Sequence, residues 1–334
     1  MIALILAGGK GTRFWPLSTP ELPKQYLKLF EKKSMLKLTY ERLTRFLNKE
    51  NIFVITTHEQ VPLIYDFLPE MNTSQIIAEP CGRNTAPCIA LSIANFLWNF
   101  KREERVLVLP SDHYIPDIDN FISDIQRADN LAKNDFLVTF GIKPSFPATG
   151  YGYIEVGEFY EDGAFHVKQF KEKPDIKTAK IFIKRGNFLW NSGIFCFSIF
   201  NMINSFEKYN KEIFDKAVEV SCLKDLNDKR KHYSLIQNIS IDSALFEKAD
   251  NVLVLPASFS WSDVGNWSSF SDLLEKDHNH NFSRGKLKSI DSFNNSIFSK
   301  KKISLIGVKD LIVVETKDAI LVCKKEKADL VGEY

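Results

Sequence analysis

Short, continuous apolar runs recur along the first 145 residues and alternate with amphipathic stretches. A short run without polar alternation is typical of a strand that is buried on both faces of a parallel sheet. The strands predicted in this way cover residues 2–7, 52–57, 76–78, 105–110 and 136–142. The amphipathic stretches predict helices over residues 34–46, 61–68, 84–100 and 121–132. This alternation predicts right-handed β-α-β units and an α/β fold with a mostly parallel sheet.

The pattern changes after residue 145. Strand-like pieces joined by loops follow, and one helix is expected near residues 177–184. The strand-like pieces cover residues 149–154, 165–170 and 193–198. The stretch from residue 199 to about 255 has a helical pattern, with amphipathic segments near residues 214–220 and 242–248. This half is expected to cover the first half and to contribute a second binding pocket.

A polar break at residues 277–281 separates these two halves from the C-terminal part. Its two histidines are flanked by Asn and Asp, which favours a solvated linker over a metal site. Short apolar pieces separated by turns follow at residues 296–298, 303–308, 311–315 and 319–323, and this spacing predicts an all-β appendage. We therefore expect a first domain over residues 1–276, with halves of about 1–145 and 146–276, and a small β-rich domain over residues 285–334.

Composition narrows the possible partners. The 334 residues are enough for a large core and a smaller second unit, and the net charge of +2 provides no bulk field for nucleic acid or a membrane surface. No apolar run has transmembrane or signal-peptide character, so we expect a cytoplasmic protein. The five cysteines are widely spaced and indicate buried free thiols rather than disulfides or a zinc site. The β-rich tail and exposed-looking aromatic residues make a homodimer the expected assembly.

The first apolar run leads directly into a loop that combines glycines with hydrogen-bond donors. Gly8, Gly9 and Gly11 lack Cβ atoms, so the backbone N–H groups of this loop can approach an anion closely. Thr12 adds a hydroxyl, and Arg13 adds a planar fork of donors that matches phosphate oxygens. The loop is therefore predicted to bind phosphate.

Two common phosphate-binding motifs do not match this loop. A dinucleotide fingerprint requires a third glycine where this chain has Phe14, and it opens a helix where this chain has Trp15 and Pro16. The P-loop requires Lys and Ser/Thr directly after its last glycine, whereas the lysines here are Lys10 and Lys24. A nucleotide site of another kind is the interpretation that remains.

Polar residues also follow the other predicted strands. Asn84 is placed to cap the helix over residues 84–100, which explains it without a ligand, although a helix N-terminus also favours a bound anion. Asp112 lies beyond the carboxyl end of a strand, where open α/β sheets bind ligands, and where an isolated Asp is also a common turn residue. His113 fits a structural role as well as a functional one.

Seven motifs together resemble one enzyme family. They are G-G-K-G-T-R-F-W-P-L-S with P-K-Q, E-P-C-G-R-N-T-A-P, L-P-S-D-H, T-G-Y-G-Y-I, F-K-E-K-P, W-N-S-G-I-F and W-S-D-V-G. Their order resembles that of the sugar nucleotidyltransferases, and most of all the mannose-1-phosphate guanylyltransferases. The resemblance implies a Rossmann-like nucleotidyltransferase domain with a mixed, mostly parallel central sheet. It also implies a small C-terminal domain like a left-handed β-helix, in a short form without the isomerase domain that some relatives carry.

The resemblance further implies roles for individual residues. The nucleotide-binding residues would be Leu6, Gly8, Gly9, Gly11, Thr12, Arg13, Glu79, Asn84, Thr85 and Ser111. The sugar-phosphate-binding residues would be Gly150, Glu172, Lys173 and Asn191. Asp112 and Asp263 would bind Mg²⁺, and the catalytic residues would be Arg13, Lys24 and Asp112. Structural alternatives are a solvated Glu172–Lys173 pair, a turn at Asn191 and a helix start at Asp263.

The implied reaction is attack by the phosphate of mannose 1-phosphate on the α-phosphorus of GTP, which gives GDP-mannose and pyrophosphate. A phosphate monoester has a second pKa of about 6, so the nucleophile needs no general base at neutral pH. Alternatives are a uridylyl- or thymidylyltransferase that uses UTP or dTTP with glucose 1-phosphate, a catalytically silent nucleotide-sensing relative, and, more distantly, a nicotinamide dehydrogenase.

Overall fold

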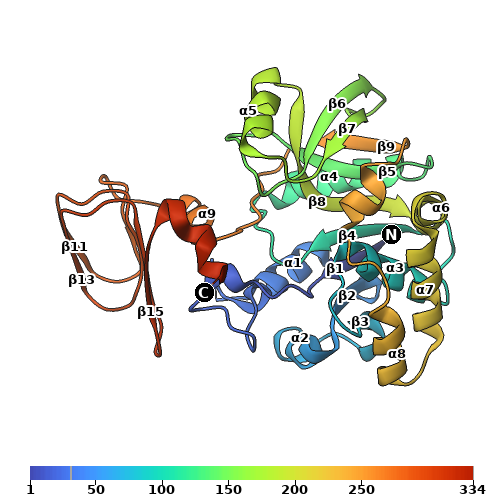
Figure 1. The fold of residues 1–334 in the computed structure, drawn as a ribbon, viewed down its shortest axis with the longest axis horizontal. Helices are drawn as coiled ribbons and strands as arrows, with labels where there is room; N and C mark the ends of the chain where they lie inside the picture. The colour runs from blue at the N-terminus through green and yellow to red at the C-terminus, as the bar shows by residue number, and fades with distance from the viewer. Residues whose placement is uncertain (31, 334) are drawn as a thin grey trace. The chain divides into compact units, whose positions relative to one another are not determined.

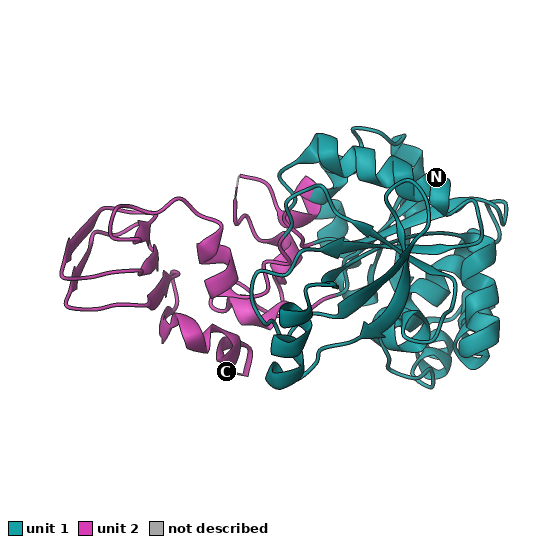
Figure 2. Cartoon of the chain, turned by 90° about the horizontal axis from the view of Figure 1, so that it is seen from above, with its two compact units in different colours: residues 1–8, 39–111, 115–261 teal, residues 9–38, 112–114, 262–334 magenta. Residues whose placement is uncertain are grey.

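The computed structural model describes residues 1–30 and 32–333. The chain forms two compact units, each assembled from segments that are distant in the sequence (Figure 2). Unit 1 comprises residues 1–8, 39–111 and 115–261, and unit 2 comprises residues 9–38, 112–114 and 262–334. Tyr334, the last residue of the expected C-terminal domain, lies outside the described residues. Within these residues, no helix is both long and apolar enough to cross a membrane.

Unit 1 is built on a nine-stranded sheet with the order β3-β2-β1-β4-β8-β5-β9-β7-β6 (Figure 1). Its strands are β1 (Ile2–Leu6), β2 (Ile52–Thr57), β3 (Ile76–Glu79), β4 (Arg105–Pro110), β5 (Leu137–Ile142), β6 (Tyr153–Phe159), β7 (Phe165–Lys171), β8 (Phe188–Ser198) and β9 (Val252–Pro256). Pairings are parallel from β3 through β2 and β1 to β4, and between β5 and β9. The strand β8 runs antiparallel between β4 and β5, so the sheet is mixed.

Helices cover this sheet because its central strands are apolar on both faces. Leu4 and Ile5 of β1 are both fully buried, as the continuous apolar run predicts. The helices are α1 (Met35–Leu43), α2 (Val61–Phe67), α3 (Thr85–Phe96), α4 (Ile118–Leu131), α5 (Ile176–Arg185), α6 (Ile199–Tyr209), α7 (Lys211–Cys222) and α8 (Leu226–Tyr233). Helices α3, α6, α7 and α8 pack against one another, and residues from α3, α6 and α7 share the main core with the strands (Figure 1).

Unit 2 combines the N-terminal loop with a small β-structure. Its elements include α9 (Trp267–Asp272), β10 (Phe282–Ser283), β11 (Leu287–Ile290), β12 (Ser296–Phe298), β13 (Ile303–Ile306), β14 (Leu311–Glu315), β15 (Ile320–Lys324) and the 3₁₀ segment η7 (Lys325–Glu333). Strands β10, β12 and β14 pair in parallel, as do β11 and β13, which is the pairing of a short parallel β-coil. Strand β15 closes it in antiparallel orientation.

The expected fold class is confirmed: a mixed sheet with helices is followed by a C-terminal parallel β-coil. The expectation that residues 199 to about 255 are helical is wrong at its end, because Val252–Pro256 forms β9 within the large sheet. The sequence V-L-V-L-P is a short apolar run of the same kind as β1, so the signal was present. Strands β10 and β11 were also missed, since they alternate weakly and lie next to polar turns.

Candidate active site

The predicted site residues are distributed over both compact units. Unit 1 contains Leu6, Gly8, Glu79, Asn84, Thr85, Ser111, Gly150, Glu172, Lys173 and Asn191. Unit 2 contains Gly9, Gly11, Thr12, Arg13, Lys24, Asp112 and Asp263. The charged residues predicted to act on the triphosphate therefore lie in unit 2, whereas the residues predicted to bind the base and the sugar phosphate, including Lys173, lie in unit 1.

The loop after β1 has a backbone conformation that requires glycine at one position. Gly11 has φ +60°, and a Cβ there would lie 2.3 Å from Cβ of Lys24 and 2.7 Å from its backbone nitrogen. Side chains rarely adopt this φ, and the close approach leaves no room for one. The Gln25 amide donates a hydrogen bond of 2.9 Å to the Gly9 carbonyl, so the loop is closed on the Lys24 segment. The loop thereby fixes where Lys24 lies.

Lys24 is the centre of a buried charged cluster. Its Nζ donates to Asp112 Oδ2 at 2.7 Å and to the backbone carbonyl of Asp263 at 2.6 Å, while its own side chain is 7% exposed. An ammonium has three N–H donors, so one is left for a ligand. The structure thus brings Lys24 into contact with two residues, Asp112 and Asp263, of which the second lies 239 positions along the chain.

Asp112 contributes its carboxylate to this cluster, whereas Asp263 contributes its backbone carbonyl. Burial would raise the pKa of Asp112, but the charges of Lys24 and His113 outweigh it and lower that pKa, so the carboxyl is ionised at neutral pH. Asp263 Oδ1 accepts from the Gly265 amide at 3.1 Å, which orients that side chain. His113 therefore has an electrostatic effect on the cluster.

The donor set of this cluster fits Mg²⁺. Mg²⁺ prefers carboxylate oxygens and is usually bound by one or two of them together with waters and substrate phosphates. Asp112 and Asp263 supply two such carboxylates. Among residues 1–30 and 32–333, no group of three or more His, Cys, Asp or Glu side chains is arranged to hold a metal ion. Waters and substrate phosphates are the further ligands that two carboxylates would leave to such a metal.

Glu79, at the end of β3, is a buried carboxyl with two donors. The Tyr233 hydroxyl donates to Glu79 Oε1 at 2.8 Å, and the Arg83 amide donates to the same oxygen at 3.2 Å. Burial raises the pKa of Glu79 to about 7, although these two hydrogen bonds lower it. The other oxygen, Oε2, lies 3.6 Å from where a Cβ on Gly8 would be. Glu79 is thus close to the end of β1.

The N-terminus of α3 is joined to the segment before Asp242. The Asn84 side chain accepts from the Thr85 amide, which confirms that Asn84 caps α3. The Thr85 hydroxyl accepts from the Ile241 amide at 2.8 Å, and the Arg83 guanidinium donates to the Ile236 carbonyl. The Ile241 amide thus uses one acceptor lone pair of the Thr85 hydroxyl, and the O–H of Thr85 can still donate.

Ser111 is held at the end of β4. Its amide donates to the Leu6 carbonyl at 3.0 Å, and its carbonyl accepts from the Thr39 hydroxyl at 3.2 Å. Ser111 is 2% exposed, and its backbone amide extends the pairing of β4 with β1. Its place next to Asp112 explains its position within the motif.

A second polar cluster surrounds Asn191. Its Oδ1 accepts from the Thr139 hydroxyl at 2.9 Å and from the Gly193 amide at 3.3 Å, while its Nδ2 donates to Asp242 Oδ1 at 2.8 Å. The Gly193 N–H can only donate, which fixes the orientation of the side-chain amide. One N–H of Asn191 is left for a ligand, whereas its Oδ1 already accepts two hydrogen bonds. Asn191 therefore offers a ligand a donor and no acceptor.

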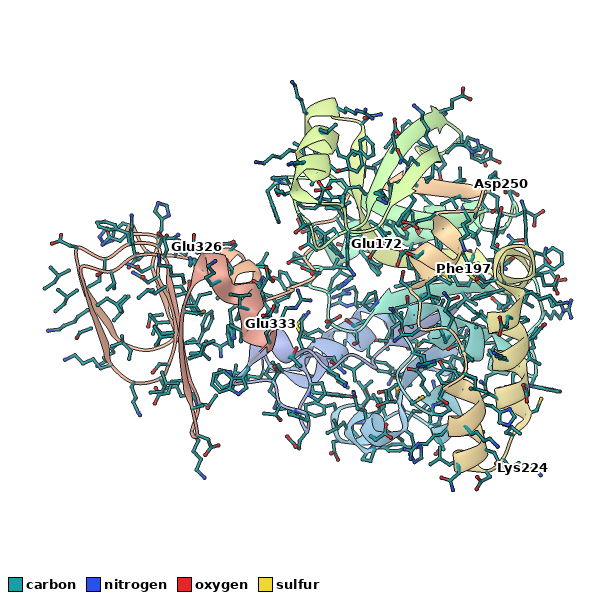
Figure 3. All side chains as sticks on the ribbon, viewed as in Figure 1. Glu172, Phe197, Lys224, Asp250, Glu326 and Glu333 are labelled. Atoms are coloured by element: carbon teal, nitrogen blue, oxygen red, sulfur yellow. The ribbon has the colours of Figure 1, made fainter. Side chains whose placement is uncertain are left out.

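Glu172 and Lys173 form the ion pair that the structural alternative predicted, with Lys173 Nζ 3.1 Å from Glu172 Oε1. The Glu172 side chain is nevertheless only 19% exposed, and Figure 3 shows it within unit 1. A Cβ on Gly152 would lie 2.8 Å from Glu172 Oε2, so the glycine makes room for this carboxylate. Around Gly150 the space is open, since a Cβ there would meet nothing within 4 Å.

Sequence reasoning missed Asp242, which begins a π-helical turn, Asp242–Phe246. Burial and the charge of Glu172 raise the pKa of Asp242 to about 7. In the sequence, Asp242 is an acidic residue at the start of an amphipathic stretch. Acidic residues are common at the start of ordinary helices, so nothing marked this one as functional. Single-turn π-helices often occur at functional sites. Tyr233 was missed for a similar reason, because an aromatic residue in a helix usually belongs to the core.

Two family models match successive parts of the chain. The nucleotidyl transferase family model matches residues 2–280, and the model of the mannoseP isomerase/GMP-like β-helix domain matches residues 285–333. A mannose-1-phosphate guanylyltransferase from Salmonella typhimurium is 38% identical, with 97% of this chain and 70% of the relative covered. The alginate biosynthesis protein AlgA from Pseudomonas putida is 36% identical, with 98% and 69% covered.

One solved structure is similar along nearly the whole chain. It is the crystal structure of a mannose-1-phosphate geranyltransferase from Thermus thermophilus, with a TM-score of 0.90 and 31% sequence identity. The similarity covers 99% of this chain and 97% of that chain. Both the sheet and the C-terminal β-coil therefore have a counterpart in a known fold.

Proposed function

Because the chain belongs to the nucleotidyl transferase family, and within it to the mannose-1-phosphate guanylyltransferases, we propose that it transfers GMP from GTP to mannose 1-phosphate and releases pyrophosphate. The observation that carries this proposal is the Lys24 cluster. A buried ammonium bonded to Asp112 and to the Asp263 carbonyl, with one N–H unused, is suited to a phosphate ligand. The phosphate-binding loop leads directly to this lysine.

The reaction replaces one bond at phosphorus. A phosphate oxygen of mannose 1-phosphate forms a bond to the α-phosphorus of GTP, and the bond from that phosphorus to the oxygen bridging to the β-phosphorus breaks. The nucleophile is largely dianionic at neutral pH, because the second pKa of a phosphate monoester is about 6. The protein therefore has to position two anions and stabilise charge on the departing pyrophosphate rather than remove a proton.

Lys24 and Arg13 would stabilise the departing charge. Lys24 offers its remaining N–H, and Arg13, whose side chain is 52% exposed, offers a planar set of donors. Asp112 and Asp263 would hold Mg²⁺. When bound, this ion neutralises phosphate charge and polarises the reacting phosphoryl group. The glycines before Thr12 leave backbone N–H groups accessible to the triphosphate.

Base and sugar recognition would fall to unit 1. Glu79 Oε2 would accept from N–H groups at the edge of guanine, while Tyr233 and Arg83 hold the other oxygen. For mannose 1-phosphate, Glu172 and Asp242 would accept from sugar hydroxyls, and Asn191 would donate its remaining N–H. Lys173 would pair with the sugar phosphate. Asp242 adds one acceptor to the set expected from the motifs.

A substrate matrix tests the proposal. GTP, UTP, dTTP and ATP are each combined with mannose 1-phosphate and with glucose 1-phosphate, and pyrophosphate release is measured in the presence of Mg²⁺. The pair of GTP and mannose 1-phosphate is expected to give the highest kcat/KM. A higher kcat/KM for UTP or dTTP with glucose 1-phosphate would contradict the assigned base and sugar. No release with any pair would favour a silent nucleotide-sensing relative.

Replacing Asp242 by asparagine is expected to change how sugar binding depends on pH. The pKa of about 7 means that Asp242 gains its charge as the pH rises through neutrality, so KM for mannose 1-phosphate should fall between pH 6 and 8. In Asp242→Asn this dependence should flatten, and KM at pH 8 should rise about tenfold, which corresponds to one lost hydrogen bond to a charged group. Initial rates at saturating GTP give the two profiles.

Asp242→Asn should also change how the free energy of unfolding depends on pH. A carboxyl whose pKa is raised on folding stabilises the fold below its unfolded pKa of about 3.9 and loses that contribution as the pH rises towards 7. The free energy of unfolding of Asp242→Asn should therefore improve relative to the wild type as the pH rises from 4 to 8. Asp250→Asn, at the exposed carboxylate in Figure 3, is the control and should leave the sugar KM unchanged. Equal losses for GTP and sugar in Asp242→Asn would contradict the role.

A further inference from the structure

The C-terminal segment η7 lies against the phosphate-binding loop, although the two are more than 300 residues apart in the sequence. Asp329 Oδ1 lies 3.7 Å from Arg13 Nη1. A Cβ on Gly332 would lie 2.8 Å from Cγ of Arg13 and 3.1 Å from the Thr12 hydroxyl oxygen. Figure 1 shows this red segment beside the blue N-terminal loop. The C-terminal segment η7 is thus in direct contact with Arg13, which is proposed to bind triphosphate.

Apolar packing fixes η7 in this place. Ala328 and Val331 are buried, and Ala328 belongs to a core cluster with Phe14, Trp267 and residues of the β-coil. The indole of Trp267 donates to the Trp15 carbonyl at 2.9 Å, which ties the loop to α9. Because the apolar side of η7 is anchored, the carboxylate of Asp329 has a defined position on its polar side.

Asp329 also contacts the motif that carries Asp263. The Asn266 Nδ2 donates to Asp329 Oδ1 at 2.7 Å, and Asn266 caps α9 by accepting from the Ser269 amide. Asp329 therefore touches both the loop with Arg13 and the segment just after Asp263. A carboxylate next to a triphosphate would be unfavourable unless a cation lies between them, and Arg13 is that cation.

We propose that Asp329 is a positioning residue for Arg13: its carboxylate, 3.7 Å from Nη1, attracts the guanidinium on that side so that the other donors face the triphosphate of the nucleotide. This inference rests on the proposed function, because it assumes that Arg13 binds phosphate. A half-exposed arginine on a loop samples many rotamers, and ordering it costs free energy at the moment of binding. The Asp329 carboxylate selects a rotamer beforehand. The β-coil part therefore contributes to nucleotide binding.

The competing interpretation is a simple surface ion pair, which would affect neither stability nor nucleotide binding by much. The side chains of Arg13 and Asp329 are 52% and 72% exposed, and such pairs contribute little to stability. We therefore expect Asp329→Asn to unfold at nearly the wild-type denaturant concentration, particularly since an asparagine oxygen still accepts from Asn266. Its effect should appear in nucleotide binding instead, where Arg13 acts.

The experiment measures GTP affinity by calorimetry with the full chain, without sugar phosphate. Asp329→Asn is expected to weaken GTP binding about fivefold to tenfold through lost preorganisation. Glu326→Gln removes a carboxylate from the same segment, as Figure 3 shows, and should bind GTP like the wild type. Asp329→Glu should recover most of the affinity, because it keeps the charge. Unchanged GTP binding in Asp329→Asn overturns the inference.

A double substitution tests whether Asp329 acts through Arg13. In an Arg13→Gln background, adding Asp329→Asn should weaken GTP binding by less than about twofold, since coupled residues are not additive. A full fivefold to tenfold loss in that background would show that Asp329 acts independently, which also overturns the inference. Gly332→Ala supplies a variant that keeps every charge. Its methyl group would displace Arg13, so it should weaken GTP binding as Asp329→Asn does, and wild-type affinity would count against the contact.

Failure of the inference is distinguishable from failure of the proposed function. Glu326→Gln is assayed in parallel for pyrophosphate release from GTP and mannose 1-phosphate. If that control catalyses the reaction while Asp329→Asn binds GTP normally, only the role of Asp329 is lost. If Glu326→Gln and the wild type neither bind GTP nor release pyrophosphate, the proposed function itself is wrong.

Discussion

Replacing Asp263 by asparagine is expected to lower Mg²⁺-dependent turnover by about two to three orders of magnitude while the fold stays intact. The contact from Lys24 is to the Asp263 backbone carbonyl, so it survives the substitution. An asparagine oxygen also still accepts from the Gly265 amide. The substitution removes the negative charge that is proposed to hold Mg²⁺. The measurement is kcat for GTP and mannose 1-phosphate across a Mg²⁺ titration, with circular dichroism as the check on folding.

Asp272→Asn is the matched control for this result. Asp272 lies in α9 of the same unit, its side chain is 64% exposed, and it pairs with Lys276. Its removal should leave kcat within about twofold, because exposed pairs contribute little. If Asp263→Asn kept near-normal rates at every Mg²⁺ concentration, Asp263 would not be a metal ligand. A loss of rate together with a lost fold would show a structural role instead.

Replacing Lys24 by methionine should reduce turnover by at least about three orders of magnitude and also destabilise unit 2. Methionine fills similar volume but supplies no donor, so the transition state loses a cation and Asp112 loses its buried partner. Leaving a partly buried carboxylate unpaired costs about 2 kcal/mol, a value reduced here because the Asp112 side chain is 31% exposed. Both effects exceed those expected of any surface lysine.

The stability effect of Lys24→Met has a defined dependence on pH. In the wild type, burial is outweighed by Lys24 and His113, and the lowered pKa of Asp112 stabilises the fold above the unfolded pKa of about 3.9. This contribution is lost as the pH falls through the folded pKa. Without Lys24, burial raises the pKa, so the stability gap between wild type and variant should be full at pH 7 and narrow towards pH 4. Urea unfolding at both pH values measures the gap.

Lys24→Arg separates the two effects of Lys24. Arginine keeps the charge next to Asp112, but its planar fork does not place a single donor at the position of Nζ, which contacts both Asp112 Oδ2 and the Asp263 carbonyl. It should restore part of the stability and little of the turnover. Equal recovery of both would mean that charge alone, rather than the position of Nζ, determines catalysis.

The sequence predicted local structure best where a residue type has one clear structural preference. The continuous apolar run at Ile2–Leu6 predicted a buried strand, and Gly11 was one of three glycines expected to permit a positive φ, which it adopts. Motif order predicted that Asp112 and Asp263 share a metal, but the contacts of Lys24 with both residues were not predicted, since no local rule links positions this far apart. Their hydrogen bonds show why the three motifs occur together.

Prediction was weakest where a residue has an ordinary local explanation. Asp242 starts an amphipathic stretch, which masked its bond to Asn191 across the fold. The strand β9 was hidden within a helical interpretation of its neighbours. Asp329 lies on a short polar segment near the end of the chain, and its partners Arg13 and Asn266 are found only through tertiary contacts. Such long-range pairs leave no signature in composition or periodicity.

Unit 2 is assembled from the first and the last parts of the chain, and this affects when it can fold during synthesis. The loop that follows β1 emerges first, but the apolar partners of Phe14 include Trp267, Phe298 and Ile312, which emerge last. Such non-local contacts form slowly because the long intervening chain must close first. Unit 1 includes residues 39–111 and 115–261, so most of it is complete before residue 262 is made. An incompletely synthesised chain would therefore be folded in its sheet yet unable to turn over GTP.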